Sequence, residues 1–327
     1  MCMAGRLDHQ RATRLAQQLH AHSVQYAHKL ATTRRAIEHN NTSHSQSTET
    51  AIITFNRLSA LQRLVKSLMQ ANYLGDSVSL TINIEAGSPK EVVDYVQTLK
   101  WPFGSLRRRH RASPSGLVPA VVESWFPSSC QEYGLLLEDD IEVSPFFYVW
   151  LKQAIVELRA SDKFNRTFGI SLYTPRVTET TNPYQRFYPD IQLRTRSNAY
   201  FYQVPCSWGA LQFPKHWVSF TEYMRHRLSY NSSFMNVPMS RTNGWTNSWK
   251  KFYIEFAWSH GLFMLYPNFP NQTSFSTNHL EQGVHISDKG LKHLPSDYTV
   301  PLHMKVVSVL SSTWLPSLQG ELENFQL

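Results

Sequence analysis

The stretch Gly134-Leu-Leu-Leu-Glu-Asp-Asp-Ile-Glu-Val-Ser-Pro145 decides the fold, because an apolar strand pattern ends there in three consecutive carboxylates. Residues 135–137 predict a short buried strand of a parallel sheet, since strands covered on both faces are continuously apolar. Ser144 and Pro145 offer an N-cap and a first-turn proline, so we expect a helix to begin there. The acids are therefore predicted at the carboxyl edge of the sheet, where open α/β sheets bind ligands.

The three carboxylates are Glu138, Asp139 and Asp140. A hard divalent cation such as Mn²⁺ or Mg²⁺ takes oxygen ligands and can bridge carboxylates to the phosphates of a substrate. The alternative is a solvated acidic turn, because acids also favour helix starts for dipole reasons. A zinc site built from thiolates does not fit this donor set.

Composition indicates a globular protein. The chain has 327 residues, of which 42% are hydrophobic and 13% aromatic, enough for one large or two ordinary domains with a real core. No segment approaches the roughly 18 consecutive apolar residues of a membrane span, and the first residues carry no apolar signal core. As written, the chain is expected to be soluble and to lack a membrane anchor.

The formal net charge of +8 suits an anionic ligand. The densest basic run, Arg107-Arg-Arg-His-Arg111, has no aromatic ladder, and the chain has no zinc-finger, RRM or KH signature, so nucleic acid is not the expected partner. The run is either a solvated basic face or a contact for a diphosphate or an anionic surface.

Cysteines and sequons leave the compartment open. A Cys130–Cys206 bridge is one of two readings, with Cys2 left over. Asn-x-Ser/Thr triplets permit a glycosylated, luminal protein. They lie at Asn40, Asn41, Asn165, Asn231 and Asn271.

The chain divides into a stem and a folded part. Residues 7–38 predict a basic helical stem, and residues 39–48 a polar linker that cannot bury anything. We therefore expect three regions: stem and linker over 1–49, and two halves of one folded domain over 50–165 and 166–327.

Strand and helix patterns alternate from residue 51. Strands are predicted at 51–55, 80–84 and 105–111, with helices after Asn56, after Ser88 and over 117–125. Later strands are predicted at 168–172, 207–213 and 263–266, and helices at 214–227 and 249–258. Alternation of this kind predicts an α/β fold with a Rossmann-like sheet flanked by helices.

The motifs, in this order, resemble those of GT-A glycosyltransferases, particularly the large family-two type. Around the acids the chain also resembles the N-acetylglucosaminyltransferase that starts hybrid and complex N-glycans. Thr54-Phe-Asn-Arg57 is similar to the first-strand motif of that family, Glu85-Ala-Gly-Ser88 to its second-strand motif, and Ser115-Gly116 to its Asn-x-Gly. Glu138-Asp139-Asp140 resembles its Asp-x-Asp. The likeness covers residues 50–160 well and extends loosely to 285.

This resemblance implies a GT-A mixed sheet and a nucleotide-sugar donor, UDP- or GDP-linked. It makes residues 50–165 the nucleotide-sugar-binding half and residues 166–327 the acceptor-binding half of the same domain. It assigns the metal to Asp140 and donor binding to Thr54, Arg57, Glu85, Gly116, Glu138 and Asp139. Glu85 and Ser115 replace the family's Asp and Asn, which leaves the donor base open. The acceptor would be a glycan, glycoprotein or glycolipid.

The general base is the weakest part of the resemblance. An inverting transferase needs a carboxylate that takes the acceptor proton, and the family carries it in an acidic-Trp motif. Here that neighbourhood reads Asn243-Gly-Trp-Thr-Asn-Ser-Trp249 and has no acid. Glu255 and Glu281 are the candidates for the general base. The alternative interpretation is that Glu255 is a solvated helix residue and Glu281 an ordinary loop residue. His285 is a candidate for the metal or diphosphate.

Two other functions stay open. A sugar-phosphate nucleotidyltransferase shares the half-sheet, but would carry a Gly-rich phosphate loop where this chain has Asn56-Arg-Leu-Ser59. A catalytically inactive GT-A domain that binds nucleotide or glycan is the other alternative. The Golgi or endoplasmic reticulum lumen is the expected location, with the cytoplasm as alternative. Membrane association would use an anchor missing from this chain or the basic stem.

Overall fold

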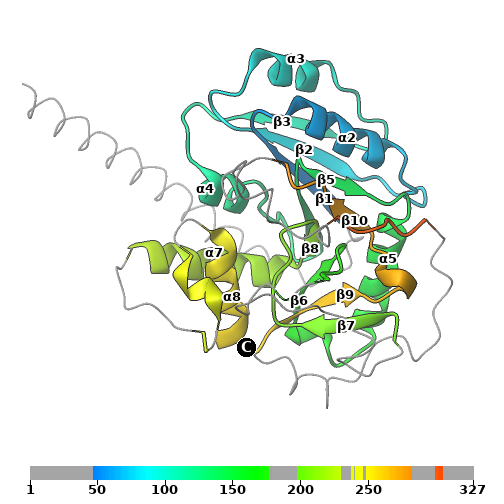
Figure 1. Ribbon diagram of the computed structural model, residues 1–327, viewed down its shortest axis with the longest axis vertical. Helices are drawn as coiled ribbons and strands as arrows, with labels where there is room; N and C mark the ends of the chain where they lie inside the picture. The colour runs from blue at the N-terminus through cyan, green and yellow to red at the C-terminus, as the bar shows by residue number, and fades with distance from the viewer. Residues whose placement is uncertain are drawn as a thin grey trace, which may run out of the picture.

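In the computed structural model, the residues described are 47–176, 178, 197–229, 237–238, 240–245, 248–281 and 299–304. The predicted helical stem, most of the linker and His285 lie outside them. One mixed eight-stranded sheet has the order β3-β2-β1-β4-β8-β6-β9-β7, and a two-stranded sheet pairs β5 with β10. The architecture is α/β, with helices packed against the large sheet (Figure 1).

The strands of the large sheet are β1 (Ser47–Thr54), β2 (Ser79–Ile84), β3 (Leu106–His110), β4 (Glu132–Glu138), β6 (Thr167–Ser171), β7 (Ala199–Tyr202), β8 (Ala210–Gln212) and β9 (Phe263–Pro267). Those of the small sheet are β5 (Ile141–Val143) and β10 (Ser276–Asn278). The α-helices are α2 (Leu58–Met69), α3 (Lys90–Thr98), α4 (Leu117–Val122), α5 (Phe147–Arg159), α7 (Pro214–Ser229) and α8 (Trp249–Ser259). Short 3-10 turns span Phe164–Arg166, Arg241–Gly244 and Pro270–Gln272.

The first half is the predicted parallel unit. β1 pairs in parallel with β2 on one side and β4 on the other, and β2 pairs in parallel with β3. The carboxyl ends of β1, β2 and β4 therefore meet at one edge. The second half departs from this pattern, because β8 enters antiparallel between β4 and β6.

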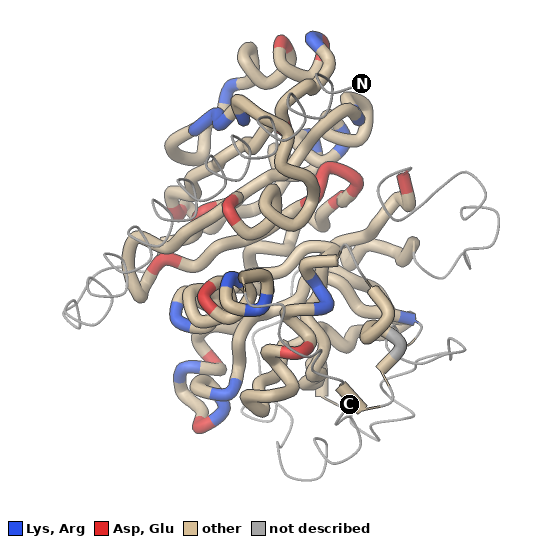
Figure 2. Tube along the Cα trace, turned by 90° about the vertical axis from the view of Figure 1, so that its left-hand side faces the viewer, with Lys and Arg blue, Asp and Glu red and all other residues tan. Residues whose placement is uncertain are grey.

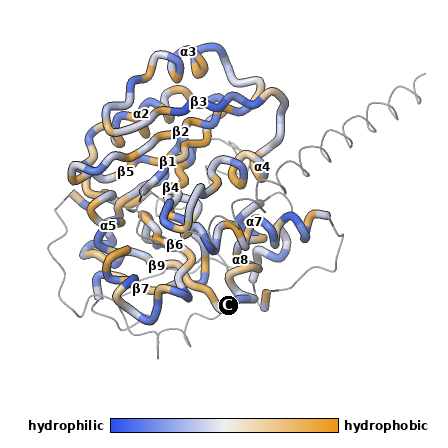
Figure 3. Tube along the Cα trace, turned by 180° about the vertical axis from the view of Figure 1, so that it is seen from behind, coloured by the Kyte–Doolittle hydropathy of each residue, from blue (hydrophilic) through white to orange (hydrophobic). Residues whose placement is uncertain are grey.

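Two apolar cores lie on opposite faces of the sheet. Alternation along β1 sends Ile52 to the core under α2, α3 and α5, and Ala51 to the core under α4, α7 and α8. Leu136 on β4 likewise packs in the second core, whereas its neighbours on either side pack in the first. In contrast to the apolar central strands β1 and β4, the edge strand β3 is hydrophilic along most of its length (Figure 3).

Several predicted boundaries were wrong in detail. β1 begins at Ser47, inside the predicted linker, because Ser47 already pairs with Glu132 of β4. The N-cap of α2 is Arg57 rather than Asn56, and that of α3 is Pro89 rather than Ser88. Neither of these caps makes a side-chain capping hydrogen bond.

The acids do not lead straight into a helix as predicted. β5 follows them and pairs antiparallel with β10, and α5 begins only at Phe147. Ser144 still caps the turn, since its Oγ accepts from the backbone N–H of Phe146 at 3.1 Å. The strands β5, β7 and β10 were not predicted, because each is short and its pairing partner is distant in sequence.

Candidate functional site

The end of β1 contacts the acids that follow β4. Thr54 Oγ1 donates to Asp139 Oδ2 at 2.8 Å. The Arg57 guanidinium forms an ion pair with Asp139 through Nη2 and with Asp140 through Nη1, the latter at 3.2 Å. The structure therefore brings together four residues of the predicted donor and metal site, from strands that pair in parallel.

Charge and burial perturb this cluster. Burial, reinforced by the charges of Asp140 and Asp139, raises the pKa of Glu138 to about 8, although Arg57 and Lys250 oppose the rise. Burial also raises the pKa of Asp139 against the opposing effect of Arg57 and Thr54. Burial lowers the pKa of Arg57, but Asp139 and Asp140 outweigh it, so the net shift is upward. Opposite charges thus hold one another in place at this edge.

One carboxylate oxygen of Asp140 has no hydrogen-bond donor among the described residues. Its Oδ2 accepts from Arg57, whereas its buried Oδ1 accepts no hydrogen bond from any described residue. Buried polar oxygens are rarely left without a partner, so this one is suited to an external ligand. The atoms near it that could bind a metal ion are carboxylate oxygens, which are the kind of ligand that Mn²⁺ and Mg²⁺ take.

The protein ligands of such a cation would be few. Within the described ranges, no group of three or more His, Cys, Asp or Glu side chains is arranged to hold a metal ion. Mg²⁺-type sites commonly use one or two carboxylates together with substrate phosphates and water. The predicted ligand His285 lies outside the described residues, and its role stays a prediction.

Glu85 is held at the next strand end. Its Oε2 accepts from Ser115 Oγ at 3.0 Å, and its Oε1 accepts from the backbone N–H groups of Ala86 and Ser115. Gly116 follows with φ +79°, a conformation that favours glycine, and is the N-cap of α4. The two departures from the family motif, Glu85 and Ser115, therefore bond to each other.

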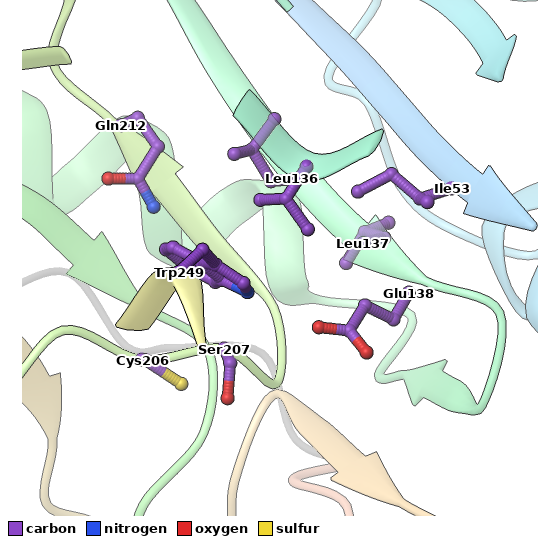
Figure 4. A pocket seen from close by; sticks show the side chains of 9 residues that line it. Ile53, Leu136, Leu137, Glu138, Cys206, Ser207, Gln212 and Trp249 are labelled. Carbon is purple, nitrogen blue, oxygen red and sulfur yellow. The ribbon is translucent and has the colours of Figure 1, made fainter. Parts of the chain in front are cut away.

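Glu138 also lines a small cavity of about 10 Å³ (Figure 4). Leu136, Cys206, Ser207, Gln212 and Trp249 are among the residues that line it. A space of this size holds about one water molecule. Its lining comes partly from β4 and partly from the start of α8, where Trp249 is buried.

Lys250 was missed by the sequence reasoning. It is only 5% exposed, and its charge lowers the pKa of Glu138. A lysine inside a helix is ordinarily solvated, so nothing in the sequence distinguished it. Figure 2 shows that acidic and basic residues occur on both halves of the described molecule, so overall charge does not single out this site either.

The two candidate bases are both in ion pairs. Glu255 is 1% exposed and accepts from Arg227 and Tyr223 of α7. Glu281 accepts from Arg63 of α2 at 2.7 Å, with 31% of its side chain exposed. The described contacts bring neither carboxylate to Asp139 or Asp140, and both catalytic roles stay predictions.

The basic run caps helices. Arg108 donates to the backbone oxygens of Val96 and Leu99 at the end of α3, while Arg109 donates to those of Glu123 and Ser124 at the end of α4. Alternation along β3 sends the two guanidiniums to opposite faces. Cationic groups at helix C-termini satisfy free carbonyls and complement the dipole. These two arginines therefore have a structural role that neither sequence reading anticipated.

Two further findings concern the cysteines and the membrane. No disulfide joins Cys130 to Cys206, so the bridge left open by the sequence is not formed. Among the helices that the structure describes, none combines the length and apolar composition of a membrane crossing.

Several solved structures are similar in fold to the chain. GalNAc-T7 with UDP, GalNAc and Mn²⁺ gives a TM-score of 0.44 at 14% identity, over 69% of this chain and 43% of that chain. The mannosyltransferase PcManGT of Pyrobaculum calidifontis with GDP-Man and Mn²⁺ gives 0.37 at 11% identity, over 60% and 54%. TarS 1-349 of S. aureus gives 0.35 at 10% identity, over 69% and 61%. The chain thus spans about half the length of these proteins.

One curated protein, the GDSL esterase/lipase ENOD8 of Medicago truncatula, is 30% identical over 104 residues. That segment is 31% of this chain and 27% of the relative, so the match spans about a quarter of the relative's length.

The family comparison covers more of the chain. The model described as the SPBC1E8.03c C-terminal domain matches residues 59–233, which is more than half of the 327 residues. This span runs from the start of α2 through the acids and β8 to the segment after α7. The chain therefore belongs to the SPBC1E8.03c C-terminal domain family.

Proposed function

We propose that this protein is a metal-dependent glycosyltransferase that moves a sugar from a nucleoside-diphosphate sugar, UDP- or GDP-linked, to a hydroxyl of a glycan, glycoprotein or glycolipid, with inversion by analogy. The observation that carries the proposal is the convergence of Thr54, Arg57, Asp139 and Asp140 at one sheet edge, where no described residue donates to the buried Asp140 Oδ1. Glu85 and Ser115 extend this edge at the neighbouring strand.

Each residue has a role that its contacts support. Thr54 and Arg57 fix the Asp139 carboxylate, which can then accept hydrogen bonds from a ribose hydroxyl. Glu85 is oriented by Ser115 toward recognition of the base or ribose. Asp140 would hold Mn²⁺ or Mg²⁺, which when bound supplies positive charge that stabilises the departing diphosphate.

Glu281 is the better of the two candidate bases. A base must reach the acceptor hydroxyl, and the Glu281 side chain is 31% exposed, whereas that of Glu255 is 1% exposed. Glu281 must part from Arg63 to act. That pair is partly solvated, and exposed ion pairs contribute only about 0–1 kcal/mol.

A second candidate is a binding domain without turnover. The ion pairs of Glu255 and Glu281 favour it, because each carboxylate is already engaged by an arginine and is not directed to a substrate. Such a domain would keep the nucleotide and cation site and lack only the base.

The test measures nucleoside diphosphate released from a panel of UDP- and GDP-sugars with Mn²⁺, with Mg²⁺ and with a chelator. Asp140→Asn should lower metal-dependent release at least 100-fold, while Asp162→Asn, at a side chain 87% exposed, should match wild type. Metal-dependent release that Asp140→Asn leaves unchanged would contradict the assignment of Asp140. Metal-dependent nucleotide binding without any release would favour the inactive domain.

A further inference from the structure

We propose that Arg57 is a built-in substitute cation: it occupies the Asp139–Asp140 pair in the ligand-free protein, and yields Asp140 to a divalent cation as its guanidinium turns to the phosphates of the donor. This inference rests on the proposed function and adds a competition between an internal residue and the cation.

The contacts of Arg57 are those of a clamp across two acids. Its Nη2 pairs with Asp139 and its Nη1 with Asp140 Oδ2. The carboxylates are nearly inaccessible, with side-chain exposures of 2% and 9%, whereas that of Arg57 is 22%. Two buried like charges need a counter-charge, and among the described pairs the guanidinium supplies it.

The two halves of the clamp are not equal. Asp139 keeps a second donor, Thr54, whatever Arg57 does. Among the described residues, the Asp140 carboxylate accepts only from Arg57 Nη1, at 3.2 Å on Oδ2, and its Oδ1 has no donor. The Asp140 half is therefore the weaker one, and it holds a carboxylate whose other oxygen is left for a cation.

A guanidinium and a divalent cation cannot share Asp140 without repulsion. Like charges about 4–5 Å apart repel strongly even at the effective dielectric of a protein surface. Cation binding should therefore be opposed by Arg57 when no phosphate is present. A nucleoside diphosphate supplies the anion that the displaced guanidinium needs, so Arg57 makes cation and nucleotide binding cooperative.

The experiment measures Mn²⁺ affinity by electron paramagnetic resonance titration, without nucleotide and with UDP or GDP, and needs no turnover. Arg57→Met should bind Mn²⁺ alone at least tenfold more tightly than wild type, and should bind UDP or GDP in saturating Mn²⁺ at least tenfold more weakly. Arg57→Lys, which keeps the charge, should stay near wild type for Mn²⁺ alone.

Arg63→Met is the matched control. Arg63 lies on α2, the helix that Arg57 caps, and pairs with Glu281 rather than with Asp139 or Asp140, so its loss removes the same charge without releasing those two carboxylates. It should leave both affinities within about twofold of wild type. Thermal melts with and without Mn²⁺ should show a larger stabilisation by Mn²⁺ in Arg57→Met than in wild type.

The outcomes separate the two proposals. Equal or weaker Mn²⁺ binding by Arg57→Met, with a folded protein by circular dichroism, overturns the competition while leaving the transferase proposal intact. If Arg57→Met does not fold, Arg57→Gln, which keeps donors for the acids, replaces it with the same expected direction. Failure of wild type and both variants to bind Mn²⁺ with or without nucleotide overturns the cation site itself, and the competition with it.

Discussion

The ion pair between Glu255 of α8 and Arg227 of α7 leads to the sharpest stability prediction. Arg227 Nε donates to Glu255 Oε2 at 3.1 Å and Nη2 donates to Oε1 at 3.4 Å, while Tyr223 adds a third donor at 3.3 Å. The side chains are 1% and 11% exposed for Glu255 and Arg227. We expect Glu255→Gln to destabilise the protein without acting at the reaction centre.

The magnitude follows from burial. Removing one partner of a fully buried pair costs about 3–5 kcal/mol, and an exposed pair contributes about 0–1 kcal/mol. Because the Arg227 head keeps some exposure and Gln retains one acceptor, we expect a loss of about 2–3 kcal/mol. For a domain of this size that lowers Tm by roughly 4–12 °C.

The assay is urea and thermal unfolding, with Glu157→Gln on α5 as a control whose side chain is partly exposed. Arg227→Met should cost a similar amount to Glu255→Met, and the double variant Arg227→Met with Glu255→Met should cost less than the sum, because no unpaired charge remains. An unchanged Tm for Glu255→Gln together with at least a 100-fold loss of turnover would refute this reasoning and make Glu255 the base.

Two further predictions concern stability. A Cβ at residue 134 would overlap ring atoms of the buried Trp125, so Gly134→Ala should cost about 2–3 kcal/mol of stability. Gly244→Ala, where an added Cβ has no atom within 4 Å, should be near neutral. Equal melting temperatures of the two variants in thermal scans would contradict this prediction. Burial, helped by the charge of Lys215, lowers the pKa of His216 to about 4, so the unfolded chain takes up a proton between about pH 6.5 and 4 that the folded protein does not. The free energy of unfolding should therefore decrease as the pH is lowered through that window. Between pH 7 and 4.5, His216→Gln should lose about 2 kcal/mol less of it than wild type in urea unfolding. Parallel pH profiles of the two proteins would exclude His216 as a source of this pH dependence.

Local pattern was sufficient for the parallel half. The apolar run before Glu138 and the alternation of residues 80–84 are properties of neighbouring residues, and a strand covered on both faces needs them wherever it lies. Because parallel strands end at a common edge, the proximity of Thr54, Glu85 and Asp140 followed from their positions after strands. The fold class and the shared edge of the candidate site were therefore predictable.

Long-range pairing was not. β8 lies antiparallel between β4 and β6, and β5 pairs with β10 across more than 130 residues, because backbone hydrogen bonds carry no sequence signature for strands of three residues. The same limit applied to side chains. From the sequence, Arg108 was interpreted as part of a charged surface, and only the structure shows that it donates to backbone oxygens at the end of α3.

The sequence alone thus determined which residues are chemically able to act, since carboxylates after buried strands are a local property. Only the tertiary structure decided what each of them is bonded to. Glu255 and Arg57 show the difference: both are ordinary charged residues in the sequence, yet packing of α7 on α8 buries one in an ion pair, and pairing of β1 with β4 places the other between two acids. The energy of a buried charge depends on its partners, and partners distant in sequence are brought together only by the fold.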